Sequence, residues 1–404
     1  MALKCYGVNK MDVTSHVKLL INDAIGFRRH LHQHPELSFK EVQTQAYIKS
    51  TLSRYGMDAH FMPSAQGLVY IIGNNPTKHT KCLLIRADMD ALPIQELTTI
   101  PFKSTVPKIM HACGHDIHMT VVAFTAIIMK QLYTQWAGSL KVIFQPGEEV
   151  LPGGASLMIE EGVLQNPKVD HAMALHVLPG LESGKVGFLQ GPYMASSDEL
   201  HVSVNGRGGH AALRKQLNDP VIASSDFIVQ LHNRFNLTEL KIPTVVSIGK
   251  VTADGATNVI PDTVQLKGTI RTRDEKWRIK VHHIIAELAA AVASQYGVEI
   301  KVEIIKGYPS LENDSAFTQQ NELIAQQVVG AENVVKLEPR MTAEDFAFFT
   351  QHVPSCFFRI GTGFSNKPNA EVHSPYFEAN ETSIEIGIRT LTSLCLNYFN
   401  HNSF

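Results

Sequence analysis

The chain has 404 residues, of which 44% are hydrophobic and 18% are charged. This composition supports two or three folded domains and excludes a single small module and a disordered chain. There are 36 Lys and Arg against 38 Asp and Glu, a formal net charge of −2, so no overall basic field is available to attract nucleic acid or an anionic membrane.

The sequence also bears on where the protein works. Its longest nearly apolar stretch, residues 121–129, is well short of the roughly 18 residues that suggest a membrane helix. The first ten residues lack the apolar block of a secretory signal. Five irregularly spaced cysteines do not resemble a disulfide framework. We therefore expect a cytoplasmic protein without a membrane span, and the 19 histidines direct attention to metal chemistry.

The first half of the chain predicts an α/β pattern. Two helices are expected first, at about 12–32 and from Ser38 to Gly56, where Ser38-x-x-Glu41 has the spacing of a capping box. Strands at 82–87, 139–144 and about 171–177 then alternate with helices at about 119–132 and 154–161. Such alternation predicts a mostly parallel sheet that is covered on both faces.

The pattern changes near Gly191. Leu200, Val202 and Val204 alternate with polar residues, as in a half-exposed strand. A helix near 220–235, strands near 245–251 and 264–272, a helix near 275–296 and a strand near 298–306 follow, an order that fits a βαββαβ sandwich. We interpret 191–306 as an α+β sandwich of ferredoxin-like type, inserted into one domain made of 1–190 and 307–404.

The strongest local motif is HACGHDIH, residues 111–118, in the predicted loop between a strand and a helix. Cys113 and His115 are two positions apart, so in extended backbone both side chains would face the same metal region. The alternative is an incidental cysteine near a helix start. Four His or Cys side chains within eight residues make that alternative less attractive.

A second motif, FQPGEE at 144–149, directly follows a strand. Adjacent residues of an extended chain point in opposite directions, which would suit Glu148 and Glu149 to different tasks. One could bind a metal while the other transfers a proton. Two solvated loop carboxylates are the alternative.

Two further histidines follow apolar segments, His176 at the end of a strand and His373 near the C-terminus. Either one alone is more often a hydrogen-bonded structural residue. Together with Cys113, His115 and Glu149, however, they fall at strand ends or in loops, where a parallel sheet gathers its functional groups. Five ligands are too many for one tetrahedral catalytic ion and suit two ions that share a ligand. The thiolate favours zinc, while the mixed ligation also admits manganese.

These residues belong to a longer series of motifs: FRRHLHQHPE (27–36), RADMDALP (86–93), MHACGHD (110–116), GRGGHAA (206–212), NVIPD (258–262), GTIR (268–271), TAEDF (342–346) and HSPYF (373–377). In this order they resemble the aminoacylase/carboxypeptidase family of dinuclear metal amidohydrolases. The branch they resemble contains hippurate hydrolase, N-acyl-L-amino acid amidohydrolases and auxin-conjugate (IAA-amino acid) hydrolases. The resemblance implies a zinc-peptidase-like catalytic domain with an inserted lid and dimerisation domain, and a homodimer.

The resemblance also implies roles for individual residues. Two divalent ions would be held by Cys113, His115, Glu149, His176 and His373, with the cysteine bridging and with Glu148 as general base. His210 would reach across the dimer to stabilise the oxyanion, and Asn258 and Arg271 would bind the free carboxylate of the substrate. One departure is Leu213-Arg214-Lys215, where relatives continue the glycine-rich turn differently; this puts specificity rather than chemistry in question.

The expected activity is therefore hydrolysis of an N-acyl amino acid, such as a hippurate- or acetyl-amino-acid-like amide, to a carboxylic acid and an amino acid. The same chemistry would serve a dipeptidase, a carboxypeptidase or an N-acetyl-diaminopimelate deacetylase. Two alternatives of other classes are a hydrolase with Cys113 as nucleophile and a non-catalytic relative that binds a ligand in the same cleft.

Overall fold

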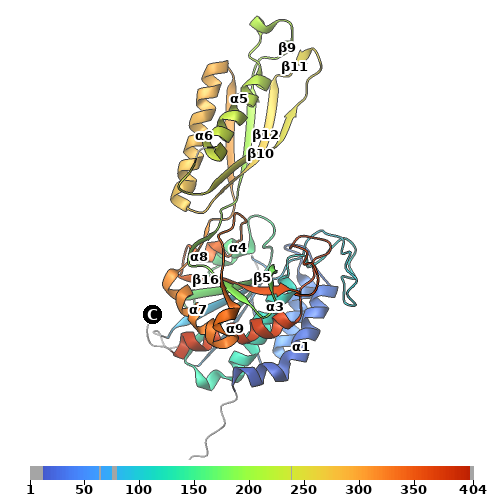
Figure 1. Cartoon of the computed structure of the whole chain (residues 1–404), viewed down its shortest axis with the longest axis vertical. Helices are drawn as coiled ribbons and strands as arrows, with labels where there is room; N and C mark the ends of the chain where they lie inside the picture. The colour runs from blue at the N-terminus through green and yellow to red at the C-terminus, as the bar shows by residue number, and fades with distance from the viewer. Residues whose placement is uncertain (1–11, 63–64, 75–79, 238, 401–404) are drawn as a thin grey trace, which may run out of the picture. The chain divides into compact units, whose positions relative to one another are not determined.

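The computed structural model describes residues 12–62, 65–74, 80–237 and 239–400. The chain divides into two compact units (Figure 1): a large unit of residues 1–190, 313–337 and 349–404, and a small unit of residues 191–312 and 338–348. The small unit begins where the sequence places the start of the inserted domain. It additionally includes 307–312 and 338–348.

An eight-stranded sheet forms the centre of the large unit, in the order β1-β2-β4-β3-β5-β16-β6-β15. In that order the strands are His60–Met62, Gly67–Asn74, Gly138–Gln145, Cys82–Asp88, His171–Glu182, Ser355–Gly363, Val186–Phe188 and Val334–Lys336. The central strands β4, β3, β5 and β16 are parallel, whereas β1–β2, β2–β4 and β16–β6 are antiparallel pairs. The predicted α/β fold with a mostly parallel sheet is confirmed.

Helices cover this sheet: α1 Val13–Gln33, α2 Val42–Ser53, α3 His115–Gln131, α4 Gly154–Glu160, α7 Ser315–Val329 and α9 Thr382–Asn400. Strands β3, β4 and β16 are buried along their whole length, which explains their continuous apolar runs. Helix α3 packs against α1 and α9 (Figure 1), and its residues 115–129 are all buried. This buried helix begins at His115, within the HACGHDIH motif, and therefore holds residues 115–118 of the motif in a fixed place.

The start of α2 corrects one prediction. The helix begins at Val42 rather than near Ser38, and the predicted capping box is wrong. The free N–H groups at the start of α2 are bound instead by Glu36, whose carboxylate accepts from Gln43 N at 3.1 Å and from Thr44 N at 2.8 Å. Ser38 and Glu41 contact segments far away in the chain, because spacing alone cannot distinguish a local cap from a tertiary contact.

The small unit is an antiparallel sheet of order β10-β12-β8-β13 with two helices. The strands are Thr244–Ala253, Thr263–Thr272, Asp198–Asn205 and Glu299–Lys306, and the helices are α5 Pro220–His232 and α6 Glu275–Tyr296. Both helices pack on the sheet (Figure 1) around a core that includes Leu200, Val202 and Val204. The chain order β8-α5-β10-β12-α6-β13 confirms the predicted βαββαβ sandwich.

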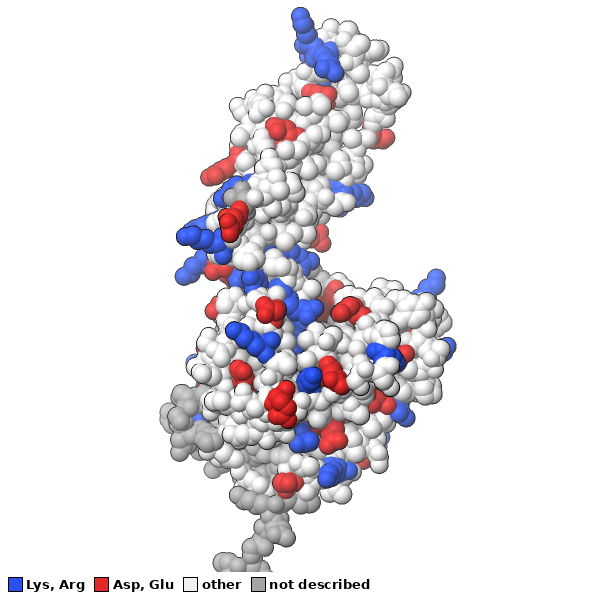
Figure 2. All heavy atoms as spheres, in the orientation of Figure 1, with Lys and Arg blue, Asp and Glu red and all other residues white. Residues whose placement is uncertain are grey.

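Short elements complete the chain: β7 Gly191–Met194, β9 Gly209–His210, β11 Val259–Ile260, β14 Leu311–Asn313 and α8 Ala347–Thr350. None of the helices in the described ranges has the length and apolar character needed to cross a bilayer. Figure 2 shows acidic and basic side chains interspersed on the visible face of the large unit, in keeping with the balanced charge.

Candidate metal centre

Metal-ligand side chains from four separate segments of the large unit lie close together. Ligand atoms of Cys113, His115 and His176 lie within 4.8 Å of one another, as do those of Cys113, Glu149 and His373. A third group of the same kind joins His115 and Glu149 to Glu148. Because Cys113, His115 and Glu149 each belong to two of these groups, we treat the six side chains as one cluster.

The elements that carry these side chains surround the ends of the parallel strands. Glu148 and Glu149 lie in a bend after β4, which ends at Gln145. His176 lies within β5, because this strand continues to Glu182 rather than ending near Val177. His373 belongs to the loop between β16 and α9, and its N–H donates to the carbonyl of Ala112 at 2.8 Å. That bond fastens the loop of His373 to the HACGHDIH motif.

Two details of the predicted local geometry are wrong, although the side chains still meet. The backbone between Cys113 and His115 is not extended: Gly114 has φ 81°, and His115 begins α3. Glu148 and Glu149 do not point in opposite directions, since one carboxylate oxygen of each lies in the group with His115. A turn and a bend, rather than strand pleating, aim these residues at the cluster.

Backbone hydrogen bonds orient two of the imidazole rings. Nδ1–H of His115 donates to the carbonyl of Asp90 at 2.9 Å, and Nδ1–H of His176 donates to the carbonyl of Val177 at 2.8 Å. Each ring therefore turns its Nε2 away from that carbonyl and toward the cluster. In His176 this atom lies 3.4 Å from Cys113 Sγ, while in His115 it is buried without a hydrogen bond to any described residue. A carbonyl on the far nitrogen is the usual support of a metal-binding histidine.

Glu149 is a second place where a polar atom is unsatisfied. Its Oε1 is buried and forms no hydrogen bond within the described part of the chain. The same oxygen lies 3.1 Å from His373 Nε2 and 4.0 Å from His115 Nε2. Buried polar atoms normally have partners, and an ion between these three atoms would satisfy all of them.

The charges around the cluster favour a cation. Burial alone would lower the pKa of His115, but Asp88, Asp90 and Glu149 outweigh burial and raise this pKa to about 10. Burial, together with Glu149, Glu148 and Asp88, raises the pKa of the Cys113 thiol well above its ordinary value. A thiol in this setting becomes a thiolate only when a cation compensates the negative charges. This counts against Cys113 as an unaided nucleophile.

Comparison with known proteins identifies the family of the chain. Residues 84–397 match the peptidase family M20/M25/M40. The chain belongs to this family. It is 35% identical over 380 residues to the IAA-amino acid hydrolase ILR1-like 4 of Arabidopsis thaliana, a match that covers 93% of this chain and 85% of that protein. It is also 35% identical over 363 residues to the N-acetyl-L-cysteine deacetylase of Bacillus subtilis, covering 89% and 84%.

A solved M20 structure has the same fold. The YXEP protein of Bacillus subtilis, described as a dinuclear metal binding peptidase, aligns with a TM-score of 0.81 and 31% identity over 95% of this chain and 99% of that one. As an M20 member, this chain is a metal-dependent amidohydrolase. The unsatisfied nitrogen and oxygen and the mixed thiolate, imidazole and carboxylate set fit two divalent ions.

The other two histidines of the HACGHDIH motif have different surroundings. His118 Nδ1–H donates to Asp88 at 2.7 Å, and its Nε2 accepts from Val177 N at 2.9 Å. Both ring nitrogens of His118 are therefore in hydrogen bonds, although its ligand atom also lies within 4.8 Å of those of Asp88 and His115. His111 is buried and, within the described ranges, belongs to none of the ligand groups.

Sequence reasoning missed two carboxylates beside the cluster. Asp88 accepts from Arg86 at 2.7 Å as well as from His118. Asp90 Oδ1 lies 3.2 Å from His115 Nδ1, and Asp90 Oδ2 accepts from Glu149 N at 2.9 Å. The signal was available, because Asp88 and Asp90 are two apart at the end of a wholly buried strand. Polar residues at that position and spacing indicate a shared functional face.

The small unit carries the remaining predicted site residues, at two separate places. His210 and Asn258 are exposed neighbours: β9 pairs with β11, and Ala211 N donates to the carbonyl of Asn258 at 3.0 Å. Arg271 lies near the far end of β12 and is half-buried. Gly208 N donates to Asp262 at 2.8 Å, which fastens the glycine-rich turn near the start of β12. Arg271 is therefore about 26 Å along the strand from that turn.

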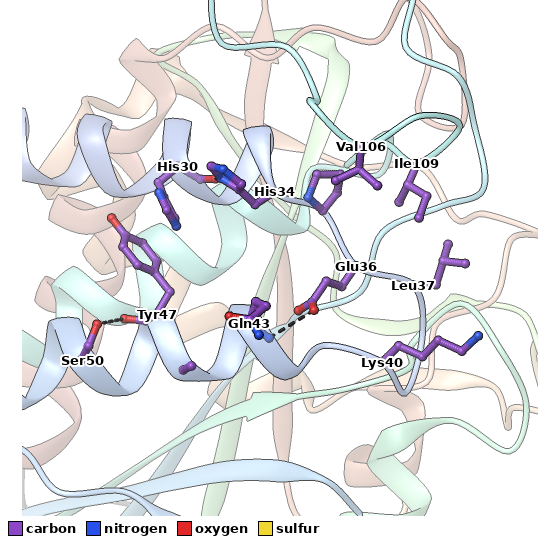
Figure 3. Close-up of a pocket in the computed structure, with 12 residues that line it drawn as sticks. His30, His34, Glu36, Leu37, Lys40, Gln43, Tyr47, Ser50, Val106 and Ile109 are labelled. Carbon is purple, nitrogen blue, oxygen red and sulfur yellow. Dashed lines mark hydrogen bonds between the residues drawn. The ribbon is translucent and has the colours of Figure 1, made fainter.

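The large unit of this M20 protein also has an apolar groove outside the cluster. Figure 3 shows it between the end of α1 and the start of α2, with Tyr47 and His30 on one side and Lys40 at the other end. The rings of His30 and Tyr47 stack at 3.7 Å. None of the six cluster side chains lines the groove, so it is separate from the metal centre.

Proposed function

We propose that this protein hydrolyses the amide bond of N-acyl-L-amino acids to a carboxylic acid and an amino acid. The observation that carries the proposal is the cluster itself. Glu148, 7% exposed, lies in one group with two residues of the cluster, His115 and Glu149. The relatives named above, an IAA-amino acid hydrolase and an N-acetyl-L-cysteine deacetylase, act on amides of amino acids, which makes this the favoured substrate class.

In the proposed mechanism Cys113, His115, Glu149, His176 and His373 would hold two divalent ions. Bound divalent ions supply an acidified water and polarise the scissile carbonyl. Glu148 accepts a proton from the water while the water oxygen bonds to the carbonyl carbon. The same carboxyl then delivers that proton to the amide nitrogen as the C–N bond breaks. Atoms balance, since one water and one amide give one acid and one amine.

We further propose that the small unit serves as lid and dimerisation domain, and that Arg271 and Asn258 bind the substrate carboxylate. A planar guanidinium is suited to a carboxylate. His210 would stabilise the oxyanion. His210 and Asn258 lie next to each other, and Arg271 is about 26 Å along the strand from their turn. One substrate can therefore meet all three residues only if His210 and Asn258 belong to a second copy. The proposal is therefore a homodimer.

Surface features of the small unit support this assembly. β10 is an edge strand, and an unpaired edge is a ready pairing surface. On the adjacent helix α5, Ile222 and Val229 are seven positions apart and 53% and 54% exposed. Seven positions are two helical turns, so both side chains lie on the same face of α5.

The metal and the compartment are also proposals. A thiolate ligand favours zinc, and carboxylate and imidazole ligands admit manganese. In the described part of the chain Cys82, Cys113, Cys356 and Cys395 are buried free thiols, which supports a reducing compartment such as the cytoplasm. Reconstituting metal-free protein with zinc or manganese, and measuring both ion content and rate, distinguishes the two ions.

The test is a substrate panel on metal-loaded protein: hippurate, N-acetyl-amino acids, indole-acetyl-amino acids, N-acetyl-diaminopimelate and dipeptides, with amine release as the readout. We expect the first three classes to be cleaved with the highest kcat/KM. Glu148→Gln should retain the ions and lose about 10²–10⁴ in rate. Faster cleavage of dipeptides or of N-acetyl-diaminopimelate would favour those alternatives. Activity in protein without metal would favour the Cys113 nucleophile, and no cleavage of any amide would favour the non-catalytic reading.

Mixing two inactive variants tests the dimer. Glu148→Gln and His210→Ala should each be inactive alone. A mixed dimer holds one site in which both residues are intact, so random exchange should restore about a quarter of the wild-type activity. No recovery in a mixture shown by light scattering to contain dimers would contradict the shared site.

A further inference from the structure

The segment between α1 and α2 reaches the loops that carry the metal ligands. Ser38 Oγ donates to Asp90 Oδ2 at 2.7 Å, and the same oxygen accepts the N–H of Glu149 at 2.9 Å. The carbonyl of Asp90 accepts from the His115 ring at 2.9 Å. Asp90 thus connects the backbone of one proposed ligand to the ring of another, and Ser38 restrains the carboxylate that makes the connection.

Glu41 restrains the other side of the same loop. Its side chain is buried, at 1% exposed, and its Oε1 accepts the N–H of Gly147 at 2.8 Å. Gly147 directly precedes Glu148 and has φ 58°. A backbone N–H bound by a buried side-chain oxygen is a directional contact, so Glu41 restrains the place where the turn that carries Glu148 and Glu149 begins.

Packing supports the same contact. Phe39 has φ 61°, which is uncommon for a residue other than glycine. Its ring lies against Gly147, where an added Cβ would come within 2.4 Å of the ring. A strained backbone persists only where its surroundings hold it. The packing of Phe39 against Gly147, in the loop that carries Glu148 and Glu149, therefore holds the unusual backbone conformation of Phe39.

A role in helix capping does not account for these two side chains. The N–H groups of Gln43 and Thr44 at the start of α2 are bound by Glu36, as Figure 3 shows for Gln43. The hydroxyl of Ser38 and the Oε1 of Glu41 are instead directed to Asp90 and Gly147. The motif that has the spacing of a capping box is connected to the metal centre.

We propose that Ser38 and Glu41 are positioning residues for the metal centre. Ser38 holds Asp90, and through it His115 and the backbone of Glu149. Glu41 holds Gly147, and through it the carboxylates of Glu148 and Glu149. The proposal rests on the metal centre described under the proposed function, but not on its substrate.

Metal affinity is the primary readout, because a residue that only stabilised α2 would not change it. Ser38→Ala and Glu41→Ala remove one restraint each. Loss of outer-shell partners weakens metal binding by about 10- to 100-fold, and we expect a change of that size in the Kd from competition with a chelating indicator. Glu41→Gln keeps an oxygen that can accept the Gly147 N–H, and should recover most of the loss.

Two control variants are matched to Glu41→Ala, one by its position in the sequence and one by its kind of contact. Lys40→Ala changes the neighbour of Glu41 whose side chain lines the groove in Figure 3. Glu161→Ala removes another carboxylate that accepts a backbone N–H, that of Ala65 at 2.9 Å. Both should leave the metal Kd within about twofold of wild type. Thermal unfolding of the metal-free forms reports separately on folding.

The result that overturns the proposal is a metal Kd within about twofold of wild type for both Ser38→Ala and Glu41→Ala. Equal losses in the Lys40 and Glu161 controls would overturn it as well, since they would indicate general destabilisation. If Glu41→Ala does not fold, the metal Kd of Ser38→Ala decides. Wild-type protein that binds metal but cleaves no N-acyl amino acid would sink the proposed function and leave this inference intact.

Discussion

Replacing Gly114 by alanine tests how the metal loop packs on β5. Gly114 has φ 81°, and a Cβ added there would lie 2.6 Å from Cγ2 of Val177. An L-residue in the left-handed conformation costs about 1–2 kcal/mol, and overpacking of a tight interior costs about 1–3 kcal/mol. We expect Gly114→Ala to lower the free energy of unfolding of the large unit by about 2–5 kcal/mol.

Gly56 provides a matched control in the same unit. It has φ 68°, and no described atom lies within 4 Å of its added Cβ. Gly56→Ala should therefore cost only the backbone term, about 1–2 kcal/mol. Denaturant unfolding of the two metal-free variants isolates the contact with Val177 as the difference between them.

The same substitution should weaken metal binding. Val177 directly follows His176, and its N–H donates to His118, so displacing Val177 moves a proposed ligand. We expect the metal Kd of Gly114→Ala to rise and that of Gly56→Ala to stay at the wild-type value. Equal stability losses in the two variants, or an unchanged metal Kd in Gly114→Ala, would refute this packing of the loop on β5.

Three further predictions address the metal and the two cores. A divalent ion present at about 100 times its Kd should stabilise the protein by about 2.7 kcal/mol, and a melting temperature that does not respond to chelation would contradict the metal centre. Arg278 and His282 outweigh burial and lower the pKa of Asp198 to about 2. The contribution of ionised Asp198 to the free energy of unfolding is present above the unfolded pKa near 3.8 and is lost as the pH falls toward 2. Asp198→Asn should therefore lower the free energy of unfolding by about 2 kcal/mol at pH 7. The difference in stability between this variant and wild type should shrink when unfolding is measured at acid pH. The buried Lys141 donates to three backbone carbonyls at 2.7, 2.7 and 3.0 Å, so Lys141→Met should lower the free energy of unfolding by at least about 2 kcal/mol, and an unchanged melting temperature would contradict these bonds.

Much of the secondary structure and the residue types of the candidate site could be read from the sequence. The helix at about 275–296 and the strand at 264–272 match α6 and β12 closely, because helical and strand periodicities of apolar residues are local properties. The grouping of Cys113, His115 and Glu149 could be anticipated because residues that follow parallel strands gather at one edge of the sheet.

The contacts that shape the centre depended on the tertiary structure. Ser38-x-x-Glu41 has the spacing of a local cap, yet its side chains bind Asp90 and Gly147, 52 and 106 positions away. The order of the sheet places β16 between β5 and β6. Ser355 of β16 pairs with Ala172 of β5, far away in the sequence, and no local pattern encodes this pairing.

The sequence by itself determined which segments form helices and strands and which side chains can bind metal, since both follow from the residues and their nearest neighbours. The tertiary structure decided which of those side chains meet, which nitrogen each histidine directs toward the cluster, and which polar groups outside the cluster form hydrogen bonds to its members. Those outcomes depend on packing between segments far apart in the chain, where one buried carboxylate such as Asp90 can be satisfied only by the partners that the fold brings to it.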